Sequence, residues 1–208
     1  LRKAIRKIIL ESADKRAIAA AEKGITFSFV GDNFEATIYC WDNGTQIGRL
    51  DCRSTWISDR IWLATDAQLQ SHVRGVGVGS LMFDIMMAHL SRKRLWMAPD
   101  TRSVSEDALP LYEWYHQHPE DYSSMQLDIS PRRSDGKIFL TPEEYDDFDT
   151  QAVFDYIGGN DDDIYSDEVY DDEEYKEKFV NHCLTKAYRM RKWGPFIENL
   201  PEGLVEWP

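Results

Sequence analysis

The chain has 208 residues, of which 42% are hydrophobic and 12% aromatic, so its length and composition suit one packed domain with an appendage. No stretch approaches the roughly eighteen consecutive apolar residues of a membrane span, and residues 1–7 are too basic for a secretory signal. The three cysteines are an odd, scattered set that fits neither a disulfide framework nor a zinc ribbon. We therefore expect a cytoplasmic protein with no membrane anchor and no metal site.

The net charge of −13 is concentrated in one acidic segment, residues 142–178. This segment contains sixteen Asp or Glu and two Lys, so it carries −14 while the rest of the chain sums to about +1. Such a dense array of carboxylates repels a phosphate backbone, which argues against direct binding of nucleic acid. Two interpretations stay open: a solvated acidic flank, or a surface that imitates nucleic-acid charge or docks a basic protein.

The first third of the chain predicts a helical segment followed by a sheet. Residues 1–23 repeat apolar side chains at helical spacing with Lys and Arg between them, and Gly24 ends this amphipathic helix or helix pair. The turn residues at 31–33 and 42–44 then separate short runs with period two, which is typical of an antiparallel meander. The runs are 26–30, 35–41, 46–50 and 61–65.

The rest of the chain predicts alternating helices and strands. Residues 79–90 are apolar nearly all round, which indicates a buried helix against the sheet. Residues 94–98 form the next expected strand, which ends at Pro99, and residues 105–115 form a helix with acidic residues in its first turn. Further along we expect two strands, 123–129 and 137–140, and two helices, 141–157 and 173–193.

A glycine-rich turn lies between the last strand of the meander and the buried helix. Alternate glycines let a ligand approach the backbone closely, and the helix N-terminus supplies unpaired N–H groups, which together suit a pyrophosphate. The spacing matches neither a P-loop nor the dinucleotide fingerprint, and a tight turn without a ligand stays the alternative. The residues concerned are Arg74, Gly75, Val76, Gly77, Val78, Gly79 and Ser80.

Two motifs in this order resemble a known family. Arg74-x-x-Gly77-x-Gly79 resembles the Gln/Arg-x-x-Gly-x-Gly/Ala signature of the GCN5-related N-acetyltransferase (GNAT) superfamily, whose loop holds the coenzyme A pyrophosphate. The later motif Ser-x-x-Ala-x-x-Leu-Tyr-Glu, which runs from Ser105 to Glu113, is similar to the family's Asn-x-x-Ala-x-x-Leu-Tyr-Glu helix. The resemblance implies an α/β (α+β) fold with a mixed, mostly antiparallel central sheet flanked by helices.

Three departures from the family pattern are visible. Ser105 replaces the usual Asn, which weakens a polar contact to the pantetheine arm, and His116-Gln117 stand where the family usually has Gly-Phe. The family's first strand precedes its N-terminal helices, whereas this chain begins with a helical pattern, so that strand is absent or cut off. The resemblance covers residues 24–140, so we expect an acetyltransferase-like core at 1–140 and an acidic helical extension at 141–208.

The resemblance implies an acetyl-CoA-dependent N-acetyltransferase that transfers the acetyl group directly to an amine substrate. It suggests the N–H of Leu69 or a neighbour as the oxyanion donor and Tyr112 as the general acid, with both residues lining the coenzyme site beside Ser105 and the glycine-rich turn. Asp66 is the expected base because it is the only carboxylate on strand 62–70, and His72 is the alternative.

The charge distribution bears on the acceptor and on possible partners. An acidic appendage attracts cations, which favours a polyamine, an aminoglycoside-like amine or lysine on a basic protein as the acceptor. The hypothesis from another class is a non-catalytic GNAT-like binding protein, whose residues 142–178 mimic nucleic-acid charge or dock a basic partner.

Overall fold

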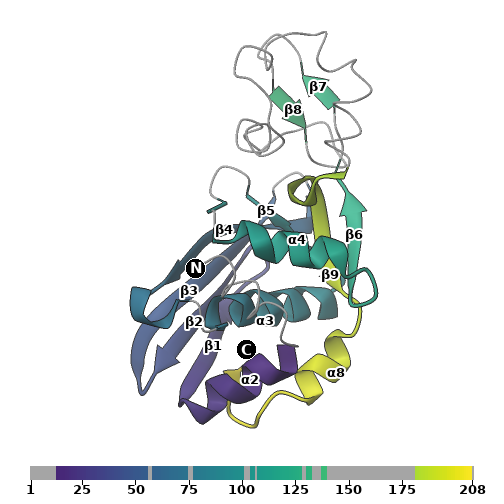
Figure 1. The fold of residues 1–208 in the computed structure, drawn as a ribbon. Helices are drawn as coiled ribbons and strands as arrows, with labels where there is room; N and C mark the ends of the chain where they lie inside the picture. Colours follow the sequence, from purple (N-terminus) through teal and green to yellow (C-terminus); the bar gives the residue numbers. More distant parts are fainter. Residues whose placement is uncertain are drawn as a thin grey trace.

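The computed structural model describes residues 13–55, 58–74, 77–100, 104–105, 107–127, 130–132, 137–139 and 181–207. It contains one large sheet covered by helices, and a separate pair of short strands (Figure 1). The strands of the large sheet are β1 (Ile25–Gly31), β2 (Glu35–Asp42), β3 (Thr45–Thr55), β4 (Ser58–Leu69), β5 (Trp96–Pro99), β6 (Tyr122–Gln126), β9 (Lys186–Met190) and β10 (Val205–Glu206). The helices are α2 (Ala13–Glu22), α3 (Val78–Arg92), α4 (Leu109–Gln117) and α8 (Trp193–Glu198), with short 3-10 helices η1 (Ser71–Val73) and η4 (Cys183–Thr185).

The sheet confirms the predicted mixed, mostly antiparallel architecture. Its strand order is β10-β1-β2-β3-β4-β5-β9-β6, and β1 to β4 form the expected antiparallel meander. Asn43 and Gly44 both have positive φ angles, 46° and 80°, which is the conformation that lets an Asn-Gly turn join two twisted strands. Helix α3 then returns the chain so that β5 pairs with β4 in parallel.

The helices lie on one face of the sheet and enclose the core. In Figure 1, α3 crosses the middle of this face, with α4 on one side and α2 and α8 on the other. Helix α3 is buried along almost its whole length, as its apolar sequence predicts, and it begins one residue before the expected range 79–90. Among the described residues, no helix is both long enough and apolar enough to cross a membrane.

The expected helix at 173–193 is wrong over residues 186–190, which form strand β9. Ala187 and Tyr188 are completely buried because β9 lies inside the sheet, between β5 and β6, and contacts the core on both faces. Four of the five residues of β9 are buried, on both faces of the strand, so its sequence lacks the apolar and polar alternation that reveals a half-exposed strand. Residues 1–12 and the acidic segment 142–178, with the helix expected at 141–157, lie outside the described residues.

Two other expected elements differ from those observed. The helix expected at 105–115 begins at Leu109, and before it the carbonyl of Ser105 accepts hydrogen bonds from the N–H groups of Ala108 and Leu109. The strand expected at 137–140 is β8 (Lys137–Phe139), which pairs with β7 (Ser130–Arg132) in the separate two-stranded sheet.

The connection between β6 and β9 places part of the core sheet after the boundary expected at Leu140. These strands are antiparallel neighbours in which Gln126 lies opposite Lys186, and the N–H of Leu127 donates to the carbonyl of Thr185 at 3.1 Å. Residues 128–181 are therefore inserted between two adjacent strands of one sheet. The expected boundary after Leu140 divides strands of the same sheet, because β9 and β10 both follow it in the sequence.

One buried histidine predicts a pH dependence of stability. His89 of α3 is 5% exposed and stacks on Phe29 with ring centroids 4.0 Å apart, while Trp207 lies parallel at 6.0 Å. Burial, and to a lesser extent Lys93 and Arg92, lowers the pKa of His89 to about 4. The imidazole of His89 therefore binds a proton more readily in the unfolded chain than in the folded one. The neutral His89 contributes its full stability above pH 6.5, and that contribution is lost as the pH falls towards about 4.

We expect this contribution to reach at most about 3 kcal/mol, the free energy of such a pKa difference. The measurement is urea unfolding at pH 7 and pH 4.5 for the wild type, His89→Phe and the control His72→Gln, which changes an exposed histidine. His89→Phe should lose less stability at the lower pH than the other two proteins. Equal losses in all three would show that His89 is not responsible.

Candidate active site

The site is organised by the separation of β4 from β5. The two strands pair in parallel from Ile61 opposite Trp96 to Ala64 opposite Pro99, and β5 then ends. Strand β4 continues to Leu69 with only β3 as a described neighbour, and a bulge interrupts the β3–β4 register directly after Ala64. We call the β5-facing backbone of residues 65–69 the open edge of β4.

The register identifies the groups that the open edge presents. The N–H of Gln70 donates to the carbonyl of Ile47 at 2.9 Å, so these two residues face each other as a hydrogen-bonded pair. In an antiparallel ladder hydrogen-bonded pairs alternate with non-bonded ones, so the N–H and C=O groups of Leu69 and Ala67 point away from β3. The carbonyl of Leu69 accepts a hydrogen bond from Arg74 Nε at 2.9 Å, in agreement with this direction.

The glycine-rich turn lies next to the end of β4. Gly77, the residue before α3, has a φ of +87°, a left-handed conformation that disfavours any side chain. Its carbonyl accepts hydrogen bonds from Leu81 N–H at 3.0 Å and from Ser80 Oγ at 2.9 Å. A Cβ built on Gly79 would lie 3.7 Å from Leu69 Cδ2, so the start of α3 approaches the open edge of β4 closely.

This turn fits the phosphate groups of a coenzyme. The N–H groups of Val78, Gly79 and Ser80 belong to the first turn of α3, where an α-helix supplies no acceptor for them, and the helix dipole adds positive potential there. The left-handed Gly77 and the missing side chain of Gly79 leave this backbone open to close approach. Gly75 and Val76, the other two residues predicted for this site, lie outside the described residues.

Tyr112 of α4 is buried between the helices and the sheet. Its residue is 2% exposed, and its ring packs edge-on against Phe83 of α3 at 6.1 Å and tilted against Tyr188 of β9 at 6.2 Å. Burial raises the pKa of Tyr112 well above its ordinary value, and Cys52, Cys183 and Asp100 add to the effect. The phenol is therefore protonated at neutral pH and can give a proton but not accept one.

The strand register places Tyr112 relative to the open edge of β4. Cys52 of β3 lies opposite Ala64 of β4, which in turn lies opposite Pro99 of β5, so the three residues form one row across the sheet. The ring of Tyr112 lies 6.2 Å from that of Tyr188, which is opposite Met97 of β5, and Cys52 contributes to the raised pKa of Tyr112. Because adjacent strands are about 4.8 Å apart, the phenol lies near the point where β4 and β5 separate.

Asp66, the base expected from the sequence, points to the other face of the sheet. It is three residues from Leu69, whose side chain faces α3, and side chains alternate between faces along a strand. Its carboxylate accepts hydrogen bonds from Arg49 Nη2 at 2.5 Å and from Gln68 Nε2 at 3.0 Å. The structure thus separates Asp66 from Leu69, Tyr112 and the start of α3.

The other expected contacts lie on the surface. Ser105 is exposed in the turn before α4, and His72, the alternative base, is exposed in η1. Arg74 is also exposed, with its guanidinium held against the end of β4.

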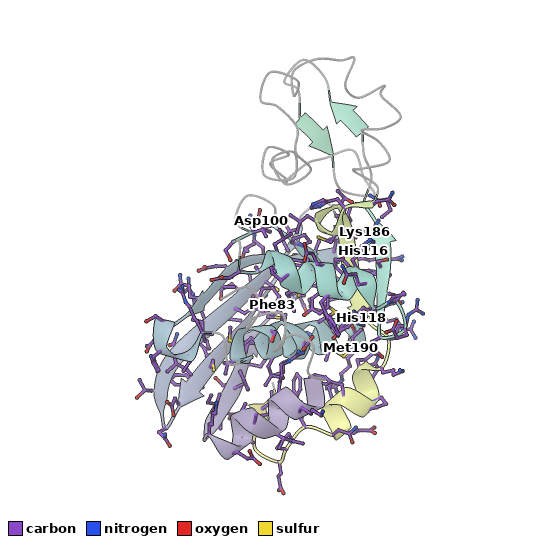
Figure 2. The ribbon with its side chains drawn as sticks, in the orientation of Figure 1. Phe83, Asp100, His116, His118, Lys186 and Met190 are labelled. Carbon is purple, nitrogen blue, oxygen red and sulfur yellow. The ribbon has the colours of Figure 1, made fainter. Side chains whose placement is uncertain are left out.

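Sequence reasoning missed Asp100, a carboxylate that is 5% exposed directly after β5. Figure 2 shows Asp100 at the end of that strand, beside the first turns of α4. The signal for it was its position immediately after Pro99, at the end of a predicted strand. Charged side chains are rarely buried unless they interact with other groups, so its burial indicates that Asp100 interacts with its neighbours.

The comparisons with known proteins find solved structures that are only weakly similar to this chain. No protein-family model matches the chain, and no curated protein matches it. A solved structure described as a GNAT-family acetyltransferase from Desulfovibrio desulfuricans is 10% identical, with a TM-score of 0.35, over 45% of this chain and 59% of that one. Nourseothricin acetyltransferase is 17% identical, with a TM-score of 0.31, over 58% of this chain and 89% of its own. The chain thus spans only 59% of the first structure, and both structures carry the name acetyltransferase.

Proposed function

We propose that this protein is an acetyl-CoA-dependent N-acetyltransferase that transfers the acetyl group directly to an amine. The observation that carries the proposal is the position of three features together. The open edge of β4 leads directly into the glycine-rich turn at the start of α3, and the buried Tyr112 lies beside the point where β4 and β5 separate.

Each feature supports one part of the reaction. Acetyl-coenzyme A, when bound, supplies an activated acetyl thioester. The N–H groups at the start of α3, with Arg74, would hold the pyrophosphate, and Ser105 would contact the pantetheine arm. The N–H of Leu69 is our candidate to stabilise the negative charge on the thioester oxygen, and the N–H of Ala67 points the same way. Tyr112 would donate a proton to the departing sulfur.

Coenzyme binding should depend on the missing side chain of Gly79. The Cβ of a valine there meets only an ordinary contact, Leu69 Cδ2 at 3.7 Å, and requires no unusual backbone angle, so Gly79→Val should fold. Unlike the alanine that the resembling signature also accepts at this position, the branched side chain would stand among the N–H groups that receive the pyrophosphate. We expect calorimetry to show a loss of coenzyme A affinity of about tenfold or more, equivalent to about 1.4 kcal/mol.

Gly77→Ala and Gly44→Ala complete this test. Both positions have positive φ angles, so each alanine should reduce stability by about 1–2 kcal/mol, but Gly44 lies in the β2–β3 turn with open space around it. We expect Gly77→Ala to weaken coenzyme binding and Gly44→Ala to leave it unchanged. Full affinity in both Gly79→Val and Gly77→Ala would remove the coenzyme from this turn.

A second candidate function concerns the acidic segment 142–178. Its position inside the inserted residues 128–181, between two strands that are already paired, supports a role separate from the core sheet. We propose that it binds a basic protein partner, either alongside catalysis or, in a non-catalytic protein, in place of it. Such binding should weaken steeply with salt, because exposed charges are screened over about 8 Å at physiological ionic strength.

A further inference from the structure

The side chain of Arg74 forms a hydrogen bond with the open edge of β4. Its Nε atom donates to the carbonyl oxygen of Leu69 at 2.9 Å, although the residue as a whole is exposed. Arg74 directly follows η1 and lies three residues before Gly77, the left-handed residue that precedes α3. The segment that leads into the glycine-rich turn therefore also contacts the last residue of β4.

The peptide unit between Leu69 and Gln70 is held from both sides. Its carbonyl accepts the hydrogen bond from Arg74, and its N–H donates to the carbonyl of Ile47 at 2.9 Å. Because a peptide unit is planar, these two hydrogen bonds in opposite directions fix its orientation. The Leu69 side chain is confined as well, since a Cβ built on Gly48 would lie 2.7 Å from Leu69 Cδ1. The end of β4 is thus held by β3 on one side and by Arg74 on the other.

The open edge of β4 presents donors and acceptors in alternation. The N–H and C=O groups of Leu69 lie on the same side of the strand, and those of Ala67 do the same. An oxygen that accepts a hydrogen bond from the Leu69 N–H therefore has a backbone carbonyl on either side of it. Such carbonyls repel the negative charge that develops on that oxygen during acyl transfer. Arg74 reduces the repulsion from one of them, because it gives the Leu69 carbonyl the donor that a neighbouring strand would supply.

The atom that makes this contact separates the hydrogen bond from the charge of the guanidinium group. Nε is bonded directly to Cδ, and in glutamine the amide nitrogen is bonded to Cδ too. A glutamine at position 74 can therefore present a neutral donor at the same distance along the side chain. Lysine has a methylene group there and keeps its charge one bond further out. The two substitutions thus preserve different properties of Arg74.

We propose that Arg74 is a positioning residue for the acetyl group, because its Nε–H bond to the Leu69 carbonyl holds the end of β4 with the Leu69 N–H directed at the thioester oxygen. This inference rests on the proposed function. The exposed guanidinium has further N–H donors that can reach a phosphate, so one side chain links the phosphate end of the coenzyme to its acetyl end. The positioning depends on the hydrogen bond, and the phosphate contact depends on the charge.

The test compares Arg74→Met, which removes both donor and charge, with Arg74→Gln and Arg74→Lys. Arg191→Met is the matched control, because Nε of the exposed Arg191 also donates to a backbone carbonyl, that of Pro119 at 2.7 Å. Thermal melting shows whether each variant is folded, and calorimetry measures its affinity for coenzyme A. The infrared stretch of acetyl-coenzyme A, isotope-labelled at the thioester carbonyl, reports the hydrogen bond to the thioester oxygen. Thiol release with spermidine gives kcat.

We expect the wild type to lower the stretching frequency of the bound thioester carbonyl relative to the free coenzyme, since a hydrogen bond weakens the C=O bond. Arg74→Met should lose most of this shift and about 10–100-fold in kcat, as expected when reacting groups are slightly misplaced. Arg74→Gln should recover most of the shift and of kcat, but it should bind coenzyme A about tenfold more weakly than the wild type. Arg74→Lys should show the reverse, and Arg191→Met should resemble the wild type.

Three results would overturn the role of Arg74 while leaving the acetyltransferase function intact. In the first, Arg74→Met keeps the wild-type shift. In the second, Arg74→Gln loses as much of the shift as Arg74→Met, so that the charge and not the hydrogen bond matters. In the third, the wild type binds acetyl-coenzyme A without any shift, which would place the thioester away from the Leu69 N–H. The shift decides among these results whatever the acceptor amine is. A wild-type protein that does not bind coenzyme A would overturn the proposed function, and the role of Arg74 with it.

Discussion

Deletion of residues 181–208 is expected to abolish folding, although these residues follow the acidic segment. The deletion removes β9 from between β5 and β6, and it removes β10 from the edge of β1. It also removes a set of core side chains that are at most 6% exposed: Cys183, Leu184, Ala187, Tyr188, Met190, Phe196 and Leu204. Burial of each larger apolar side chain contributes about 1.5–3 kcal/mol, so their combined loss is comparable to the total stability of about 5–15 kcal/mol of a typical domain.

Excision of residues 128–181 is expected to preserve the fold, in contrast to the deletion. The register that pairs Gln126 with Lys186, and the hydrogen bond from Leu127 to Thr185, hold the two ends of this insertion next to each other. A linker of about four to six residues from Leu127 to His182 is long enough for a hairpin connection. The retained His182 keeps its side-chain hydrogen bond from Leu184 N–H, which caps η4.

Circular dichroism and thermal melting of the two proteins provide the measurement. We expect a cooperative melt from the excised protein and none from the deleted one. The excised residues carry a net charge of −13, which is the formal charge of the entire chain. The same protein therefore tests the acidic segment, since it should bind coenzyme A normally but lose any salt-sensitive binding of a basic partner. A cooperative melt from the deleted protein would show that β9 is not part of the folding core.

The parts of the fold that were predicted correctly are those with local signals. The Asn43-Gly44 turn and the alternation on either side of it specify a hairpin within a few residues. Helix α3 was recognised because its first turn follows alternate glycines and its sequence is apolar on all sides. In each case the residues that determine the structure are neighbours in the chain.

The parts that were missed depend on partners far away in the sequence. Strand β9 pairs with β6 across the long insertion, and its two buried faces remove the alternating pattern of a strand. Which face Asp66 occupies depends on its register with β3, and the burial of Asp100 depends on how β5 ends against β4 and α4. No window of sequence contains this information, so the surroundings of these two carboxylates could not be predicted.

Removal of Asp84 or Arg16 alone is expected to reduce stability by about 3–5 kcal/mol. Asp84 of α3 is completely buried, and it forms an ion pair with Arg16 of α2. Its other oxygen accepts hydrogen bonds from the hydroxyls of Tyr115 in α4 at 3.1 Å and Tyr122 in β6 at 3.2 Å. Four elements therefore meet at one carboxylate, and loss of either charged residue breaks a buried ion pair.

Urea unfolding of Asp84→Leu, Arg16→Met and the double variant tests this prediction. The double variant should be more stable than the sum of the single losses implies, because it buries no uncompensated charge. The control is the exposed pair of Lys192 and Asp121, with side chains 67% and 48% exposed, where Lys192→Met should cost less than about 1 kcal/mol. If the losses at Asp84 and Arg16 were additive, their charges would be compensated independently. The convergence of α2, α3, α4 and β6 would then depend on apolar packing rather than on this ion pair.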